Sequence, residues 1–372
     1  MGATDLVANG VSPACPTGPT RAWKNGGSFE GGSTVASDTA RAPHESAPSS
    51  GPGRPSALAA VVDALACPVC GLSVELEPDA RALTCRDGHG FDIAKQGYVS
   101  LLRGGGNATT GDNAEMVAAR DALLGRGHYA RIADAVADAV ETAKPQGLVV
   151  DLAGGTGYYL ERVLRSHPHL RGIDVDLSKF AARRAARRGA PVALPQPQTL
   201  ADNQTQTAVG AQLSTLDPAP TLAAVVADVW QPLPLQTGVA AAILSIFGPR
   251  NRPEILRVLQ PGGRLVVVTP TARHLRELIG PLGMIGVDDR KQERLAAQLD
   301  GFVDLSSTSV EYETSMSHAD VVNDVLMGPS AHHVDADRLA ARVAELPDPV
   351  AVTVSVTVTT AFAPREPSAD QG

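Results

Sequence analysis

The sequence has few of the residue types that mark several large classes of protein. Aromatic residues make up 3% of the 372 residues and charged residues 19%, so a core must be built mainly from Ala, Val and Leu. Lys and Arg number 32 against 40 Asp and Glu, which gives a net charge of -8. The chain therefore has no general basic surface that could hold nucleic acid by charge alone, and any RNA contact must come from a local patch.

Long apolar runs and a secretory signal are also absent. No apolar run approaches the ~20 residues that cross a bilayer, and residues 1–13 have no basic start followed by an apolar stretch. Four cysteines are too few for a disulfide scaffold at this length, and three of them lie close together. We therefore expect a reduced, cytoplasmic protein with no membrane contact.

Composition and hydrophobic spacing divide the chain into segments. The N-terminal residues are rich in Gly, Pro, Ser, Thr and Ala without an apolar period, which is typical of disorder. A stretch rich in Gln, Thr and Pro later interrupts the regular pattern. We predict a disordered tail (1–56), a zinc-binding module for RNA recognition (57–103), a helical linker (104–146), a catalytic domain (147–364) with a flexible inserted loop (191–220), and a C-terminal tail (365–372).

Short apolar runs alternate with helical stretches after residue 147. The predicted strands are 148–152, 170–175, 223–227, 239–246, 264–269 and 351–358, and the predicted helices are 158–166, 178–188, 252–259 and 271–280. This alternation favours a doubly wound, Rossmann-like α/β domain with a mostly parallel sheet. Residues 351–358 alternate strictly, as in a strand with one covered face, and 115–143 show helical spacing.

The cysteine cluster has the spacing of a zinc site. Cys67, Cys70, Cys85 and His89 follow the pattern C-x2-C-x14-C-x3-H, which suits one closed, tetrahedral structural zinc ion. A segment this short would need the folding free energy that such a metal supplies. The alternative is a C-x-x-C redox pair, but its surroundings are not thioredoxin-like. Cys15 has no predicted role.

A glycine-rich turn follows the first strand of the α/β domain. Asp151 ends the strand, and Gly154, Gly155 and Gly157 allow the backbone to approach a ligand closely. A strand, a glycine turn and a helix are shared with dinucleotide-binding proteins. Here the third glycine of G-x-G-x-x-G is missing and an acid precedes the turn, which favours S-adenosylmethionine (AdoMet).

Acids also end the next two predicted strands. We expect Asp176, with Asp174 as the alternative, to accept hydrogen bonds from the ribose hydroxyls of AdoMet. Asp228 and Val229 would lie near its adenine. Each acid alone is more often a helix cap or a solvated turn residue. Three acids at three strand ends of one domain favour the cofactor site.

Several motifs resemble the RlmA/TlrB family of 23S rRNA guanine-N1 methyltransferases. The likeness extends over most of residues 65–363 and is greater to the TlrB branch, which is associated with tylosin resistance. It departs at Ala153, where the family generally has glycine, and at Gly248, where it has alanine. The motifs are the zinc module with residues 89–99, residues 116–120 and 127–129, the glycine turn, and residues 227–230, 247–251, 261–263, 327–330 and 344–347.

The resemblance implies AdoMet-dependent methylation of N1 of a guanine in a 23S rRNA hairpin loop, with macrolide resistance as a consequence. Phe247 is our candidate for stacking the target base and Arg250 for contacting its O6 or a phosphate. The alternative role of Phe247 is that of a core aromatic residue, and the alternative role of Arg250 is to anchor its loop by an ion pair. His128 and Tyr129 are further candidates for the same region, and no general base is assigned.

Several alternatives stay open. Arg183, Arg184, Arg187 and Arg188 form either a solvated helix face or a phosphate contact. The partners expected are the rRNA hairpin and, as an option, a second copy of the chain in a homodimer. A small-molecule AdoMet methyltransferase with a structural zinc module is the main alternative function, and a non-catalytic zinc-ribbon RNA binder is another.

Overall fold

The computed structural model describes residues 56–103, 111–140, 147–189, 220–284, 297–328 and 335–365. All of these belong to one unit, residues 54–372. The predicted tail up to residue 55 with Cys15, residues 191–219 of the predicted loop and the C-terminal residues 366–372 lie outside the described residues. Among the helices described, none is both long and apolar enough to cross a bilayer.

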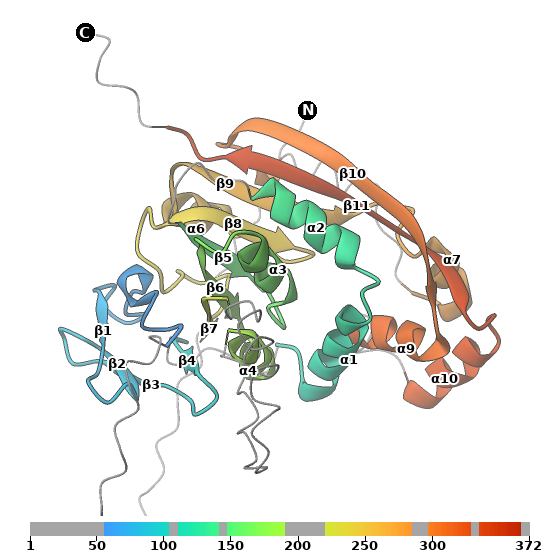
Figure 1. Ribbon diagram of the computed structural model, residues 1–372, viewed down its shortest axis with the longest axis horizontal. Helices are drawn as coiled ribbons and strands as arrows, with labels where there is room; N and C mark the ends of the chain where they lie inside the picture. Colours follow the sequence, from blue (N-terminus) through green and yellow to red (C-terminus); the bar gives the residue numbers. More distant parts are fainter. Residues whose placement is uncertain are drawn as a thin grey trace, which may run out of the picture. The chain divides into compact units, whose positions relative to one another are not determined.

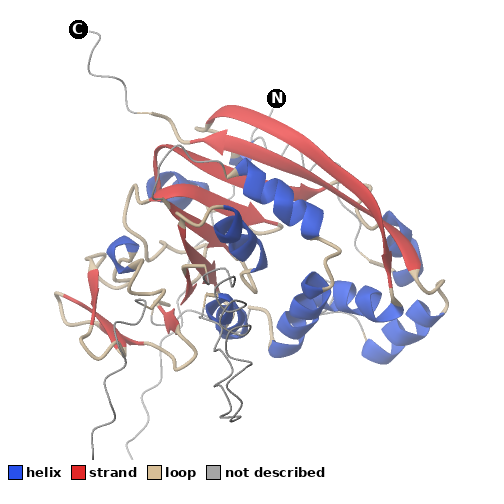
Figure 2. Cartoon of the chain, viewed as in Figure 1, coloured by secondary structure: helices blue, strands red, loops and turns tan. Residues whose placement is uncertain are grey.

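An eight-stranded sheet forms the centre of the described structure (Figures 1 and 2). Its strands lie in the order β10-β11-β9-β8-β5-β6-β7-β4, and pairing is parallel from β4 to β9, while β11 runs antiparallel to both neighbours. This confirms the predicted Rossmann-like fold with a mostly parallel sheet. The strands are β4 (Tyr98–Ser100), β5 (Leu148–Leu152), β6 (Arg171–Asp176), β7 (Leu222–Val226), β8 (Ala240–Ile246), β9 (Leu259–Pro270), β10 (Val303–Met316) and β11 (Val350–Phe362).

Half of the described α-helices begin where a polar side chain satisfies the first free backbone N–H groups. Asn113 caps α1 and Ser178 caps α4 by accepting hydrogen bonds from the next turn, and Ser317 with Asp320 forms a capping box on α9. The helices are α1 (Ala114–Gly125), α2 (Ala130–Ala139), α3 (Tyr158–Ser166), α4 (Lys179–Arg188), α6 (Arg252–Val258), α7 (Arg276–Leu282), α9 (His318–Met327) and α10 (Ala336–Ala344).

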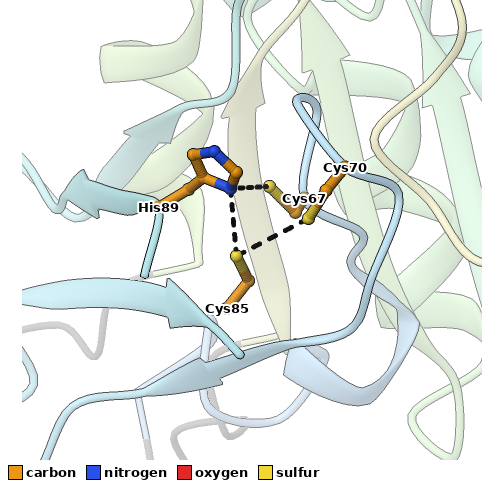
Figure 3. Close-up of side chains that lie close together, drawn as sticks. All are labelled: Cys67, Cys70, Cys85 and His89. Atoms are coloured by element: carbon orange, nitrogen blue, oxygen red, sulfur yellow. Dashed lines mark hydrogen bonds between the residues drawn. The ribbon is translucent and has the colours of Figure 1, made fainter. Parts of the chain in front are cut away.

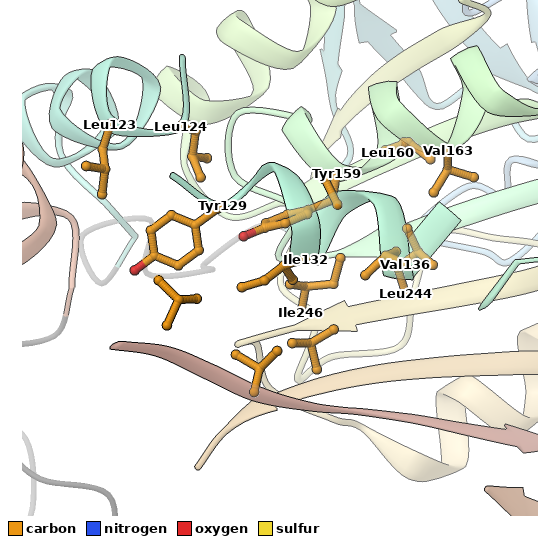
Figure 4. Close-up of a cluster of buried hydrophobic side chains, with 14 of the residues drawn as sticks. Leu123, Leu124, Tyr129, Ile132, Val136, Tyr159, Leu160, Val163, Leu244 and Ile246 are labelled. Carbon is orange, nitrogen blue, oxygen red and sulfur yellow. The ribbon is translucent and has the colours of Figure 1, made fainter. Parts of the chain in front are cut away.

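Two apolar clusters cover the two faces of the sheet. On one face, Leu244 and Ile246 of β8 pack with Ile132 and Val136 of α2 and with Leu160 of α3 (Figure 4). On the other face, the alternate residues of the strands pack with α6 and with the segment 57–103. Alternation of aliphatic side chains along buried strands therefore supplies both cores, as the low aromatic content requires.

The predicted zinc module shares its core with the main sheet. The short strands β1 (Val74–Leu76), β2 (Ala82–Cys85) and β3 (Gly90–Asp92) form a small antiparallel sheet, and β4 then pairs in parallel with β7. Leu65 and Val99 are fully buried in the same cluster as Ile173 and Val225. The boundary predicted at residue 103 therefore does not separate two hydrophobic cores.

The structure corrects three local predictions. Residues 115–143 do not form one helix, because α1 ends before Gly127, whose φ of +84° interrupts the helix, and α2 starts at Ala130. The predicted helix 271–280 begins only at Arg276, after a turn that pairs with β11. The long edge strand β10 was not predicted, because its polar, largely exposed residues lack an apolar period.

The C-terminal strand also differs from its prediction of one covered face. β11 lies between β9 and β10, and Thr353 and Ser355 on its polar face are almost fully buried. Thr353 donates from its Oγ1 to Glu277 Oε1 at 2.7 Å, and the Ser355 N–H donates to His274 Nδ1 at 3.2 Å. Polar partners on and before α7 therefore cover a face that the alternation suggested was solvated.

Candidate functional site

The predicted zinc ligands come together from two tight turns (Figure 3). Cys67 and Cys70 lie in the turn before β1, where the Gly71 N–H donates to the Cys67 carbonyl. Cys85 ends β2, and the Cys85 N–H donates to the carbonyl of His89 in the next turn. The four ligand atoms all lie within 4.8 Å of one another, the one such group of three or more found in the described residues.

The spacing of these atoms fits tetrahedral coordination. Cys70 Sγ lies 3.7 Å from Cys85 Sγ, and His89 Nδ1 lies 3.7 Å from Cys67 Sγ and 3.3 Å from Cys85 Sγ. Zinc–sulfur bonds of ~2.3 Å in a tetrahedron give edges of about 3.8 Å. Burial raises the pKa of the Cys85 thiol, but hydrogen bonds from His89 and Asp87 outweigh it and lower the pKa to about 7, which favours the thiolate that binds metal. The donor set therefore fits zinc.

The glycine turn is fastened to the end of the neighbouring strand. Asp176 accepts a hydrogen bond from the Gly155 N–H at 2.9 Å and another from the Ser178 N–H at 2.7 Å. Gly155 and Gly157 have φ values of +65° and +72°, which glycine adopts without strain. Ala153 has a φ of +55° in the same turn, where its side chain is strained. The structure thus brings Asp176 and the predicted glycines together.

Asp151 and Asp174 lie buried beneath this turn. Asp151 is 1% exposed and Asp174 is fully buried, and neither carboxylate has a hydrogen-bond partner among the described residues. A side chain at Gly154 would overlap the Asp174 carboxylate and come within 2.8 Å of Asp151 Oδ2. Burial, followed by the charge of Asp176, raises the pKa of Asp151 to about 8, and burial with the charge of Asp151 raises the pKa of Asp174 well above its usual value.

Arg120 covers the same turn from a distant helix, and the sequence did not identify it as a site residue. Its Nη1 lies 3.2 Å from where a Cβ of Gly155 would be. The guanidinium forms an ion pair with Asp112, and its Nη2 donates to the carbonyl of Met327 at 2.8 Å. Arg120 is 35 residues before Gly155, and no local spacing links them.

Asp228 and Val229 follow β7, at the same edge of the sheet. Asp228 Oδ1 accepts from the Trp230 N–H at 2.9 Å, and the Val229 carbonyl accepts from the Asn251 side chain at 3.1 Å. The Asp228 carboxylate therefore caps its own turn. This contact uses one carboxylate oxygen, and the adenine contact stays a prediction.

Three aromatic rings meet beyond the end of β8. Phe247 stacks on His274 with centroids 5.9 Å apart and planes at 22°, and Tyr129 meets both rings edge-on. The Tyr129 hydroxyl donates to Asp324 at 2.8 Å, and burial raises the pKa of Asp324 to about 6. The sequence pointed to Phe247 and Tyr129 but missed His274 and Asp324, which packing of α7 and α9 brings here.

His128 and Arg250 point to other partners. His128 contacts Asp320 at 3.3 Å and Thr314 at 3.1 Å. Arg250 donates to Gln298 at 2.6 Å and to the Gly248 carbonyl at 3.3 Å, and burial lowers its pKa. The contacts of Arg250 match the alternative of a loop anchor. A contact of Arg250 with the guanine O6 or a phosphate stays a prediction.

The four arginines of α4 divide into two pairs. Arg184 and Arg188 form ion pairs with Asp121 of α1, and Arg188 also pairs with Glu161. Arg183 and Arg187 are exposed. Of the four, the second pair is therefore better placed to meet phosphate.

Comparisons with known proteins identify relatives of this chain. Residues 65–103 match a zinc-ribbon family model described as RlmA, N-terminal. The chain is 42% identical to the 23S rRNA (guanine(748)-N(1))-methyltransferase of Streptomyces fradiae over 80% of this chain and 96% of that protein. It is 40% identical to a candidate 23S rRNA (guanine-N1)-methyltransferase of Micromonospora griseorubida, over 78% and 95%. A Bacillus subtilis protein, the candidate enzyme YxjB, is 26% identical over 57% and 66%.

Proposed function

The chain belongs to the family of 23S rRNA (guanine-N1)-methyltransferases, and on this premise we propose that it transfers a methyl group from AdoMet to N1 of a guanine in 23S rRNA. The observation that carries the proposal is the 42% identity over almost the whole length of the Streptomyces fradiae enzyme. The name of that enzyme specifies guanine 748, and we propose the same nucleotide for this chain. The cofactors are AdoMet and one structural zinc ion.

The carboxyl edge of the sheet would hold the methyl donor. Bound AdoMet would supply the methyl group from its sulfonium, with the thioether S-adenosylhomocysteine as the leaving group and the N1 proton of guanine lost. Asp176 would accept from the ribose hydroxyls, while Gly154, Gly155 and Gly157 keep the turn free of side chains. Asp151 lies under the turn, and Asp228 with Val229 would contact the adenine. The chain's task is to position the donor and acceptor in line.

The aromatic cluster beyond β8 would hold the acceptor base. Phe247 has an exposed ring with a strained φ of +54°, which holds it out from the end of the strand. Such a ring can stack a base that has left the RNA stack. The ring of His274 stacks on Phe247. Arg250 is the candidate for contacting the guanine O6 or a phosphate.

RNA recognition would use the zinc-binding segment, a few exposed arginines and the shape of the substrate. We propose a hairpin loop as the substrate, because unstacked loop bases offer the edges that duplex RNA hides. Arg183 and Arg187 would contact phosphates. A homodimer and resistance to tylosin-type macrolides are further predictions. The first is tested by sedimentation, and the second by growth on tylosin with and without the gene.

The decisive experiment compares 23S rRNA from cells with and without this gene by primer extension. Because methylation of guanine N1 blocks Watson–Crick pairing, a new stop at guanine 748 is expected only when the gene is present. Tritium from labelled AdoMet would then be counted on a hairpin transcript, on duplex RNA and on free GTP. Transfer to the hairpin alone is expected. Equal labelling of free nucleotides would favour a small-molecule methyltransferase instead, and no AdoMet binding would favour a non-catalytic RNA binder.

Substitution of the target guanine identifies the atom that is methylated. Inosine keeps N1–H and O6 but lacks the exocyclic amine, whereas adenosine has no N1–H. Partial activity on the inosine hairpin with none on the adenosine hairpin is the expected result for N1. Activity on adenosine equal to that on guanosine would contradict it.

A further inference from the structure

Helix α4 concentrates positive charge in a chain whose net charge is -8. It contains one Lys and four Arg and no acidic residue. Arg184 and Arg188 are tied to neighbouring helices by ion pairs with Asp121 and Glu161. The exposed residues of the helix, which we call the α4 face, are Lys179, Phe180, Arg183 and Arg187. Every exposed side chain of α4 is therefore cationic or aromatic.

The cations of the α4 face do not stabilise the helix. Lys179 is the first residue of α4, where a cation opposes the helix dipole, and the first turn has no acid. Lys179, Arg183 and Arg187 are spaced four residues apart, so like charges follow one another along the helix, which is unfavourable. Neither arginine forms an ion pair with another described residue. An anionic ligand would turn this repulsion into attraction.

The zinc-binding segment, residues 57–103, extends the α4 face. The turn 94–97 between β3 and β4 contains the exposed Lys95. A Cβ on Gly97 would lie 3.9 Å from the Cβ of Ala186 in α4, and β4 packs beside this helix (Figure 1). Positive charge therefore continues from α4 onto the turn of the zinc-binding segment that packs against it.

Phe180 adds an aromatic ring at the start of α4. Its side chain is 37% exposed, and Lys179 Nζ lies 5.3 Å from the ring centroid. The other exposed aromatic side chains among the described residues are Trp230 and Phe247, and the three follow the carboxyl ends of β6, β7 and β8. An exposed ring beside a row of cations is the combination that holds single-stranded nucleic acid.

We infer that the α4 face, together with Lys95, holds the backbone of the RNA strand that adjoins the target nucleotide, with one unpaired base stacked on Phe180. This inference rests on the proposed function and deepens it, because it gives the RNA a path from the zinc-binding segment to the carboxyl edge of the sheet. The three cations of α4 are about 6 Å apart along the helix axis and span roughly 12 Å. A free phosphate would meet one of them, whereas a polynucleotide meets the whole row.

The test measures the affinity of the 23S rRNA hairpin at several salt concentrations by fluorescence anisotropy. Each phosphate contact contributes about 0.7–0.9 to the slope of the logarithm of the association constant against the logarithm of salt concentration. We expect the triple variant Lys179→Gln, Arg183→Gln and Arg187→Gln to lower this slope by about two to three and to weaken binding about tenfold or more at physiological salt. Lys95→Gln alone should lower the slope by about one.

Phe180 is tested by the same measurement. Phe180→Ala should weaken hairpin binding about fivefold or more without a change in slope, because a stacked base carries no charge. Phe180→Tyr keeps the ring and should retain the affinity. A change in slope for Phe180→Ala, or full affinity of this variant, would contradict the stacking role.

Matched controls separate RNA contact from folding. Arg338 is exposed on α10, which packs on α7 and α9, so Arg338→Gln should change neither the slope nor the affinity. The triple variant should be at least as stable in thermal unfolding as the unaltered chain, because it loses like charges from one helix. Its AdoMet affinity should stay within about twofold, since its three positions have no part in the cofactor site as proposed.

The outcomes distinguish this inference from the proposed function. If the triple variant keeps the slope and affinity of the unaltered chain, the inference is wrong while the proposed function stands. A dimer in sedimentation that the triple substitution dissociates, with RNA binding unchanged, would assign the α4 face to a contact between copies of the chain and also overturn the inference. If the unaltered chain neither binds nor methylates the hairpin, the proposed function itself fails.

Discussion

Asp151 and Asp174 lie side by side at paired positions of the parallel strands β5 and β6, and both carboxylates are buried without a hydrogen-bond partner among the described residues. Two such groups cannot both be ionised at low cost, because each raises the electrostatic energy of the other. Burial of both carboxylates therefore lowers the stability of the unliganded chain. It therefore makes the stability of the unliganded protein depend on pH.

Asp151→Asn should stabilise the unliganded chain at neutral pH. Because burial raises the pKa of Asp151 from 3.8 to about 8, the folded chain holds a proton between about pH 4 and pH 8 that the unfolded chain has released. Stability therefore falls as pH rises through this window, and the substitution removes that loss. We expect a gain of at least about 1 kcal/mol in unfolding free energy at pH 7.5 and little gain near pH 4.

Urea unfolding without cofactor at several pH values measures this effect. Asp134→Asn is the control, because its carboxylate is half-exposed and pairs with Arg162 at the surface. A gain for Asp151→Asn that stays constant from pH 4 to pH 8 would contradict the buried acid pair.

Ala153→Gly and Gly154→Ala should have opposite effects. Ala153 has a φ of +55°, so glycine relieves backbone strain there, and we expect stabilisation of roughly 0.5–1 kcal/mol. At position 154 an added methyl would overlap the Asp174 carboxylate, and we expect a loss of about 1–3 kcal/mol together with weaker AdoMet binding. Thermal unfolding of the two variants side by side measures both changes in stability. If both substitutions stabilised the chain, or both destabilised it, the result would be inconsistent with this turn geometry.

Local patterns allowed part of the site to be predicted from the sequence. The zinc ligands lie within 23 residues, and the glycine turn directly joins β5 to α3, so spacing alone identifies both. Strands in the buried sheet were also recognisable, because continuous aliphatic runs are typical of parallel sheets.

Residues that reach the site through tertiary packing were not predictable in this way. Arg120 arrives on α1, His274 in the turn before α7, and Asp324 on α9. No local spacing in the sequence links any of these three residues to the glycine turn or to Phe247. The same limit explains β11, whose polar face is buried because Glu277 and His274 cover it.

Cys70→Ser should lower zinc content from about one ion per chain and destabilise the fold. Cys70 is one of four ligands, and its loss opens a closed tetrahedral site. Because the zinc-binding segment shares a core with the sheet through β4, we expect a lower melting temperature as well as lower RNA methylation. Metal analysis and calorimetry check both, and full zinc occupancy in the variant would exclude this ligand set. Deleting residues 67–102 would be less informative, since it also removes β4.

Asp176→Ala should weaken AdoMet binding about tenfold or more. The carboxylate would accept from both ribose hydroxyls, and losing two charge-assisted hydrogen bonds costs about 1.5–3 kcal/mol. The carboxylate also holds the Gly155 and Ser178 amides, so Asp176→Asn, which keeps an acceptor, should lose less. Calorimetry with adenosine and 2′,3′-dideoxyadenosine separates the two roles. A variant that weakens both nucleosides equally would assign Asp176 to the turn alone.

Phe247→Ala should lower kcat/KM for the RNA about tenfold or more and leave AdoMet affinity within about twofold. The ring is 42% exposed and stacks on His274, and base–aromatic stacking contributes about 1–3 kcal/mol per base. Phe247 has a φ of +54°, so Phe247→Gly relieves strain and should keep the fold at least as stable while it loses the same activity. Phe247→Tyr keeps a stacking face and should retain most of the activity. Single-turnover methylation of the hairpin, with AdoMet binding measured in parallel, distinguishes stacking from folding. A fully active Phe247→Gly variant would assign the ring to packing against His274 and Tyr129, because that variant keeps the backbone and removes only the aromatic face.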